Sequence, residues 1–118
     1  MSRRLQRLNV LLQQEISELI RRELRDPRLA EIVTLTEVSI SPDLAAATVY
    51  VSILGDDDEK AETIKVLVHA APFLRRQLMG RLSIRRTPDI YFTLDESMEK
   101  AARMLDLMKR LPGTHPEA

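Results

Sequence analysis

The sequence predicts an α+β fold in two layers, a three-stranded sheet with helices packed on one face. Apolar residues recur at helical spacing near both ends of the chain, and three runs rich in β-branched and apolar residues lie between them. The predicted order is helix, strand, strand, helix, kink, helix, strand, helix, without an internal repeat. A chain of 118 residues with 44% hydrophobic content can bury one core without disulfides or a structural metal. We therefore expect one domain over residues 1–111 and a flexible tail over residues 112–118.

The first predicted element is an amphipathic helix over residues 4–24. Its apolar side comprises Leu5, Leu8, Leu12, Ile16, Leu19 and Ile20. The opposite side and its flanks carry an arginine ridge, formed by Arg3, Arg4, Arg7, Arg21, Arg22 and Arg25. Asp26-Pro27 ends the helix, because proline disfavours helical geometry at the residue before it. Asp26 can then cap a short turn that starts at Pro27.

A β-hairpin is predicted next, with strands over residues 33–40 and 48–54 joined through residues 41–44. In the second strand the side chains at 49, 51 and 53 share one face. The first strand changes phase between Leu35 and Val38. A phase change of this kind predicts a β-bulge near Glu37.

The rest of the chain is predicted to be mainly helical. The acidic run over residues 56–59 favours a helix start, and Pro72 predicts two helices that meet at a kink over residues 70–72. A third strand is expected over residues 90–94. Asp95 then caps a last helix that ends at residues 109–110. Its apolar stripe consists of Met98, Ala101, Leu105 and Met108.

Charge is segregated along the chain, although eighteen basic and eighteen acidic side chains cancel overall. Residues 26–63 hold nine acids against two bases. Residues 70–88 hold five arginines and no acid, namely Arg75, Arg76, Arg81, Arg85 and Arg86. A strongly basic face on a neutral chain favours association with nucleic acid.

The residue types argue against several other functions. With no cysteine, the chain has no disulfide, thiolate nucleophile or thiolate metal site, and its composition suits the cytoplasm. His69 and His115 have no plausible nucleophile or acid partner, so we expect no catalytic residue, cofactor or small-molecule substrate. The acids at 56–59 lack the spacing of a calcium loop, so no metal site is expected. No apolar run approaches the ~20 residues that cross a bilayer, so we expect no membrane partner.

Several short segments carry a resemblance to a known family. They are Asp26-Pro27-Arg28-Leu29, Ser41-Pro42-Asp43-Leu44, Val49-Tyr50-Val51-Ser52 and Phe73-Leu74-Arg75. The longest set is Leu82, Arg85, Pro88, Ile90, Phe92, Asp95, Ser97, Glu99 and Arg103. In order and spacing, over roughly residues 5–107, these segments resemble the bacterial ribosome-binding factor A family, whose fold is a type II KH domain. The resemblance implies a non-enzymatic factor that binds the free small (30S) ribosomal subunit, assists late maturation and processing of 16S rRNA, and leaves before translation. Members of this family are also associated with growth in the cold.

One position departs from the family pattern. Ordinary KH domains clamp a nucleic-acid backbone with a Gly-x-x-Gly loop, and the three glycines of this chain cannot form one. The resembled family instead has Ala-x-Gly at the kink between two helices, where this chain has Ala70-Ala71-Pro72. Proline still breaks a helix, but it removes one N–H donor and stiffens the kink.

Two interpretations of the arginines remain open at this stage. Charge runs are usually solvated helix faces, but the bias of residues 70–88 and the resemblance favour phosphate contact. For the ridge on the first helix, phosphate contact and a solvated face are about equally favoured, because Glu15 and Glu18 can pair with its arginines. We therefore expect a monomer that binds 16S rRNA of the small subunit through the arginines named above. The alternative is a protein-interaction adaptor that docks through its acidic region and helical faces.

Overall fold

The computed structural model describes residues 3–24, 28–82 and 85–112. The elements run in the order α1 (Arg3–Glu23), α2 (Arg28–Ile32), β1 (Val33–Ile40), β2 (Ala46–Ile53), α3 (Asp57–Arg81), β3 (Asp89–Leu94) and α4 (Ser97–Arg110). Asp26-Pro27, where the sequence predicts the end of the first helix, lies outside the described residues, as do residues 113–118 of the predicted tail.

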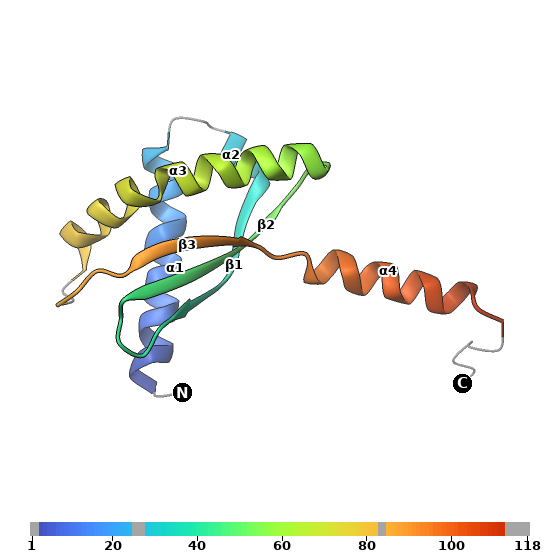
Figure 1. Ribbon diagram of the computed structural model, residues 1–118, viewed down its shortest axis with the longest axis horizontal. Coiled ribbons are helices and arrows are strands. Elements are labelled where there is room, and N and C mark those ends of the chain that lie inside the picture. Colours follow the sequence, from blue (N-terminus) through green and yellow to red (C-terminus); the bar gives the residue numbers. More distant parts are fainter. Residues whose placement is uncertain (1–2, 25–27, 83–84, 113–118) are drawn as a thin grey trace.

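The sheet has the order β1-β2-β3, with β1 antiparallel and β3 parallel to the central strand β2. Helix α3 makes the crossover between the two parallel strands (Figure 1). The register of β1 against β2 shifts between Leu35 and Glu37, so the predicted bulge is confirmed. Thr36 is the extra residue; its hydroxyl donates to Asp95 Oδ2 at 2.6 Å, and its oxygen lies 3.3 Å from the carbonyl oxygen of Tyr50.

One face of the sheet forms the core with α1 and α3. Alternation along β2 buries every second side chain, from Ala47 to Ile53, and leaves the others partly exposed. Leu12, Ile16 and Leu19 of α1 are fully buried against this face, as are Leu67, Leu74 and Leu78 of α3. The predicted two-layer α+β class is therefore confirmed, and the apolar side predicted for the first helix is the side that packs.

Helix α3 differs from the prediction of two helices, because it is a single helix that runs through Pro72. Proline cannot donate to the carbonyl four residues earlier, so a helix interrupted in this way usually bends. Figure 1 shows that the C-terminal part of α3 turns away from the axis of the first part. Buried residues on both sides of Pro72, Leu67 and Leu74 among them, hold the two parts on one core. Tertiary packing thus maintains a helix that local propensity would end.

Helix α3 begins as the acidic run predicts. Asp56 Oδ1 accepts from the backbone N–H of Glu59 at 2.8 Å, and Glu59 Oε1 accepts from the backbone N–H of Asp56 at 3.1 Å. This reciprocal pair is a capping box, which satisfies two of the N–H groups that a helix start leaves without partners.

Helix α4 does not cover the sheet. It has the predicted apolar stripe, but none of its residues is buried, and Figure 1 shows it extending away from the sheet. The radius of gyration, 17.4 Å, exceeds the value of about 13.5 Å typical of a compact chain of this length. Its N-cap is Glu96 instead of the predicted Asp95, although Asp95 Oδ1 still accepts from the backbone N–H of Ser97 at 3.0 Å.

Candidate RNA-binding surface

One end of the sheet lies beside two segments that carry arginines, α1 and residues 85–88. Strand β1 ends there, and β2 and β3 both begin there, since Ala47 is the register partner of both Ile40 and Ile90. The N-terminal half of α1 lies against the same end, because Asn9 Oδ1 accepts from the backbone N–H of Ile40 at 2.9 Å. We call this region, with the turn at residues 41–45 and the segment at residues 85–88, the hairpin end.

The turn of the hairpin is tightly bonded. Ser41 donates its backbone N–H to the carbonyl of Ala46 at 2.8 Å, and its hydroxyl to Asp43 Oδ1 at 2.7 Å. Leu44 adopts a φ of 61°, a backbone conformation that residues other than glycine rarely adopt. Its side chain is partly buried against the core. The Ser41 hydroxyl, and next the Ala45 N–H, lower the pKa of Asp43, and the positive charge of Arg86 lowers it further. The guanidinium of Arg86 therefore acts electrostatically on this turn.

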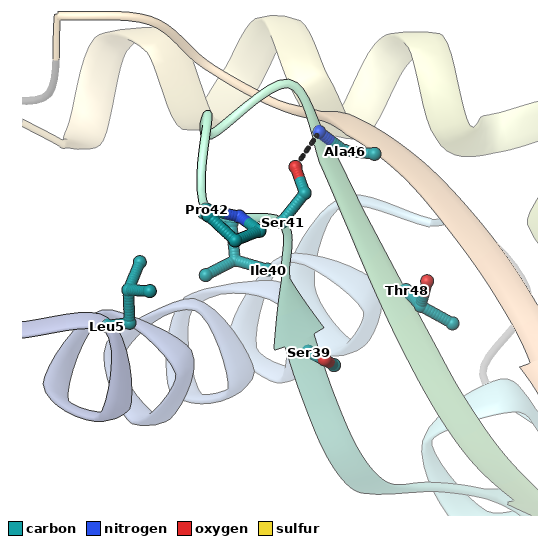
Figure 2. A pocket seen from close by; sticks show the side chains of 7 residues that line it. All are labelled: Leu5, Ser39, Ile40, Ser41, Pro42, Ala46 and Thr48. Carbon is teal, nitrogen blue, oxygen red and sulfur yellow. Dashed lines mark hydrogen bonds between the residues drawn. The ribbon is translucent and has the colours of Figure 1, made fainter. Parts of the chain in front are cut away.

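A pocket of about 420 Å³ lies beside the turn. Figure 2 shows its lining, with Leu5 coming from α1 and the others from β1, the turn and β2. The hydroxyls of Ser39, Ser41 and Thr48 are its polar groups, and that of Ser41 accepts from the backbone N–H of Ala46 at 3.0 Å. The pocket contains no charged side chain, so the candidate phosphate-binding groups are the arginines around it.

Two of the predicted arginines hold the fold together. Arg75 Nε donates to the carbonyl of Thr87 at 3.1 Å and lies 3.3 Å from Asp89 Oδ1, which ties α3 to the start of β3. Arg81 Nη1 lies 2.9 Å from Glu15 Oε2 and ties α3 to α1. Both guanidinium groups have acidic partners within the protein, so a phosphate contact at either one would compete with an ion pair.

Arg76, Arg85 and Arg86 are exposed and form no ion pair with the described residues. Thr87 and Pro88, which follow directly, are buried. The buried dipeptide anchors the segment, so that two adjacent guanidinium groups project from a fixed backbone. Residues 83–84, which the sequence places in the same connection, lie outside the described residues.

The arginine ridge of α1 divides into two groups. Arg3, Arg4 and Arg7 are exposed near the hairpin end, and none forms an ion pair with a described residue. A shallow hollow of about 460 Å³ is lined by Arg3, Gln6, Arg7 and Val10. Arg21 and Arg22, at the other end of the helix, both pair with Glu18, which is the intrahelical pairing that the sequence allows. Arg25 lies outside the described residues.

The hairpin end therefore brings together two groups that are far apart in the sequence. One comprises the N-terminal arginines of α1, and the other comprises Arg85 and Arg86. Arg76 follows Arg75, which bonds Thr87 of the same segment. Guanidinium groups without acidic partners suit phosphate oxygens, which they bind with paired N–H donors. Arg75 pairs with Asp89 of the next element, and Arg81 pairs with Glu15, sixty-six residues away in sequence. Neither pair has the i,i+3 or i,i+4 spacing by which ion pairs can be predicted from sequence.

Other kinds of site are not apparent in the part of the chain that the structure describes. No group of three or more histidine, aspartate and glutamate side chains there is placed to hold a metal ion. No described helix is long and apolar enough to cross a membrane.

Comparison with known proteins identifies the family. The family model described as Ribosome-binding factor A matches residues 4–108. This chain belongs to the ribosome-binding factor A family. The ribosome-binding factor A of Acetivibrio thermocellus is 42% identical over 105 residues, which cover 89% of this chain and 85% of the relative.

Solved structures agree with this assignment and with the expected KH-like fold. The solution structure of a Thermotoga maritima protein of this family matches with a TM-score of 0.72 and 35% identity, over 84% of this chain and 93% of that one. A homology model of the Thermus thermophilus ribosome-binding factor A, fitted into a cryo-EM map of a 30S complex, matches with a TM-score of 0.62 and 26% identity, over 76% of this chain and 93% of that one. These relatives favour the assembly factor over the adaptor.

Proposed function

We propose that this protein is a non-enzymatic assembly factor of the cytoplasm that binds the free 30S subunit and assists late maturation and processing of its 16S rRNA. The observation that carries the proposal is the set of exposed arginines at the hairpin end, in a chain whose Thermus thermophilus relative has been fitted into a 30S complex. The partner is the 16S rRNA, contacted through phosphates and shape more than through base sequence.

The proposed mechanism is selective occupancy. A protein that binds one conformation of the rRNA more tightly than another shifts the equilibrium toward the first by that difference in affinity. No bond is made or broken, so the described residues need only position positive charge. Arg75 and Arg81 keep α3, β3 and α1 in place, and the unpaired arginines contact the RNA.

Sedimentation of the purified protein with 30S subunits over a salt series tests this proposal. Neutralising each phosphate releases counterions, so the logarithm of affinity should fall linearly with the logarithm of salt concentration, by about 0.9 per contact in the case of B-DNA. We expect tight co-sedimentation at low salt and a slope of several units. Isolated 50S subunits serve as the control. Equal binding to both subunits, or a slope near zero, would contradict the proposal.

A further inference from the structure

The helices leave one face of the sheet open. Helices α1 and α3 pack on the opposite face, and α4 extends away from the sheet (Figure 1). On β2, the partly exposed side chains Thr48, Tyr50 and Ser52 alternate with buried ones, so they point to the open face. Tyr91 of β3 lies on this face too, and it is 56% exposed. The open face therefore carries hydroxyl groups and an accessible aromatic ring.

The pocket of about 420 Å³ beside the turn opens on this face. Ser39 and Thr48 are register partners on β1 and β2, and Ala46 lies two residues before Thr48, so their side chains share the open face. Neither the Ser39 nor the Thr48 hydroxyl forms a hydrogen bond with another described group. Figure 2 shows the apolar side chains of the lining, namely Leu5, Ile40 and Pro42. The pocket thus combines an apolar wall with two hydroxyls that can each donate and accept, and its volume falls in the range of about 300–1,000 Å³ typical of small-ligand pockets.

Tyr91 stands at the border of the pocket. It is the register partner of Thr48, so its side chain starts next to that of Thr48 on the open face. An exposed tyrosine ring stacks on flat heterocycles, and such stacking tolerates any base because every base has a π face. A nucleobase is flat, uncharged and edged with donors and acceptors. The apolar wall, the two hydroxyls and the adjacent ring suit such a group.

Positive charge lies on both sides of the pocket. On one side, Leu5 comes from the N-terminal part of α1, where Arg4 and Arg7 are exposed. On the other side, Arg86 is near enough to the turn for its charge to lower the pKa of Asp43. An RNA strand whose phosphates contact both groups of arginines passes over the pocket between them. The charge pattern therefore favours a base that belongs to a polyanion.

Two acids lie near the pocket, and the protein engages both. Asp43 Oδ1 accepts from the Ser41 hydroxyl at 2.7 Å. Asp89, the register partner of Ala46, has its Oδ1 3.3 Å from Arg75 Nε. These carboxylates therefore oppose a nearby phosphate less than unpaired carboxylates do.

We propose that this pocket binds one unpaired base of the rRNA and that Tyr91 stacks on that base. The inference rests on the proposed function, because the arginines of the hairpin end hold the phosphates on either side. A base inside a duplex must first leave its stack, which costs free energy, so the pocket favours rRNA in which this base is already unpaired. The pocket thereby gives selective occupancy a structural basis, since the protein binds the conformation with the exposed base more tightly than one in which the base is paired.

Short oligonucleotides test the base pocket without the ribosome. An adenylate hexamer and an abasic hexamer carry the same phosphates, but only the first has bases. The chain has no tryptophan and two tyrosines, so in a Tyr50→Phe background the intrinsic fluorescence reports Tyr91 alone. At low salt, the adenylate hexamer should quench this fluorescence. In anisotropy titrations of end-labelled hexamers, it should also bind at least about 5-fold more tightly than the abasic hexamer. Ala46→Leu, which fills the pocket, should abolish this preference.

Binding to 30S subunits tests the same residues in the proposed function. Tyr91→Ala removes the ring and Ala46→Leu fills the pocket, so each should weaken 30S binding by about 5- to 150-fold, the range for the stacking of one base. Neither substitution removes a phosphate contact, so the salt slope should equal that of the wild type. Two control variants should bind like the wild type. Tyr91→Phe keeps the ring, and Ser52→Leu adds bulk at the far end of the open face.

Thermal unfolding checks the fold of each variant, and none of the replaced residues is buried. Equal affinity of the wild type for the adenylate and abasic hexamers overturns the inference. Wild-type 30S affinity in both Tyr91→Ala and Ala46→Leu, while reversal of Arg85 and Arg86 to glutamate lowers it, also overturns the inference and leaves the arginine surface without a base pocket. A wild type that does not bind 30S subunits refutes the proposed function instead, and the hexamer comparison still decides the inference.

Discussion

Reversing Arg85 and Arg86 to glutamate is the sharpest test of the hairpin end. Both side chains are exposed and form no ion pair with a described residue, so the folded protein loses few contacts. Surface substitutions of this kind change the free energy of unfolding by less than about 1 kcal/mol. Thermal unfolding of the double variant should therefore resemble that of the wild type. The pKa of Asp43 should rise, because the positive charge of Arg86 helps to lower it.

The effect on 30S binding should be much larger. A hydrogen bond to a charged group contributes about 1.5–3 kcal/mol, so losing two such contacts weakens binding by about 100-fold or more. Two fewer phosphate contacts also lower the salt slope by about 1.8, and the new carboxylates add repulsion. Co-sedimentation with 30S subunits at several salt concentrations measures both the affinity and the slope.

The matched variant reverses Arg3 and Arg7, which lie on the α1 side of the hairpin end. We expect a smaller loss of binding, since these residues lie in the first two turns of α1, and helix ends fray, whereas buried Thr87 and Pro88 anchor the segment of Arg85 and Arg86. A folded Arg85/Arg86 variant with wild-type affinity and slope would refute the assignment of the surface. A larger loss from the Arg3/Arg7 variant would move the contact to α1.

Three further predictions concern the framework of the domain. Gly80→Ala should raise the free energy of unfolding by about 0.5–1 kcal/mol, as measured in urea, because a Cβ at this helical position meets no atom within 4 Å. A decrease in this free energy would show that the added methyl group clashes with its surroundings. Pro72→Ala should stabilise the protein by up to about 3 kcal/mol, because alanine restores the missing helical hydrogen bond. It should also straighten α3 and so weaken 30S binding. Unchanged 30S binding would show that the bend is not needed. The Thr36 hydroxyl, and next Ser97, hold the pKa of Asp95 at about 2, below the usual 3.8. The contribution of Asp95 to stability is therefore complete above pH 3.8 and is lost as the pH falls through about 2. In an NMR titration, Thr36→Val should raise this pKa toward 3.8, and an unchanged value would remove the hydroxyl as its cause.

Local sequence patterns predicted the helices and strands well, because apolar side chains recur at one spacing in a helix and at another in a strand. The bulge could be located near Glu37 because a single inserted residue exchanges the two faces of a strand. The start of α3 could be predicted because its capping box spans only Asp56 to Glu59. In both cases the deciding interactions lie within a few residues or in the neighbouring strand.

The sequence did not predict which surface packs against a helix, or which ion-pair partner a charged side chain has. The apolar stripe of α4 predicts an apolar face but does not specify what packs on it, and no residue of α4 is buried. Pro72 breaks the local pattern, yet the core contacts of α3 keep one helix across it. The ion pair of Arg81 with Glu15 could not be predicted, because Glu15 is sixty-six residues away in sequence. Pairings of this kind depend on the tertiary fold and leave no local signal.

The parallel pairing of β2 and β3 has a consequence for how the chain folds as it is synthesised. A nascent chain that has reached the end of α3 can already form α1 and the β1–β2 hairpin, but the second edge of β2 still lacks a neighbour. That edge presents unpaired N–H and C=O groups next to the apolar side chains of β2, and such edges recruit strands from other chains. Only Asp89–Leu94, which is synthesised after α3, covers it. The risk of aggregation is therefore greatest between the synthesis of α3 and the emergence of β3 from the ribosome.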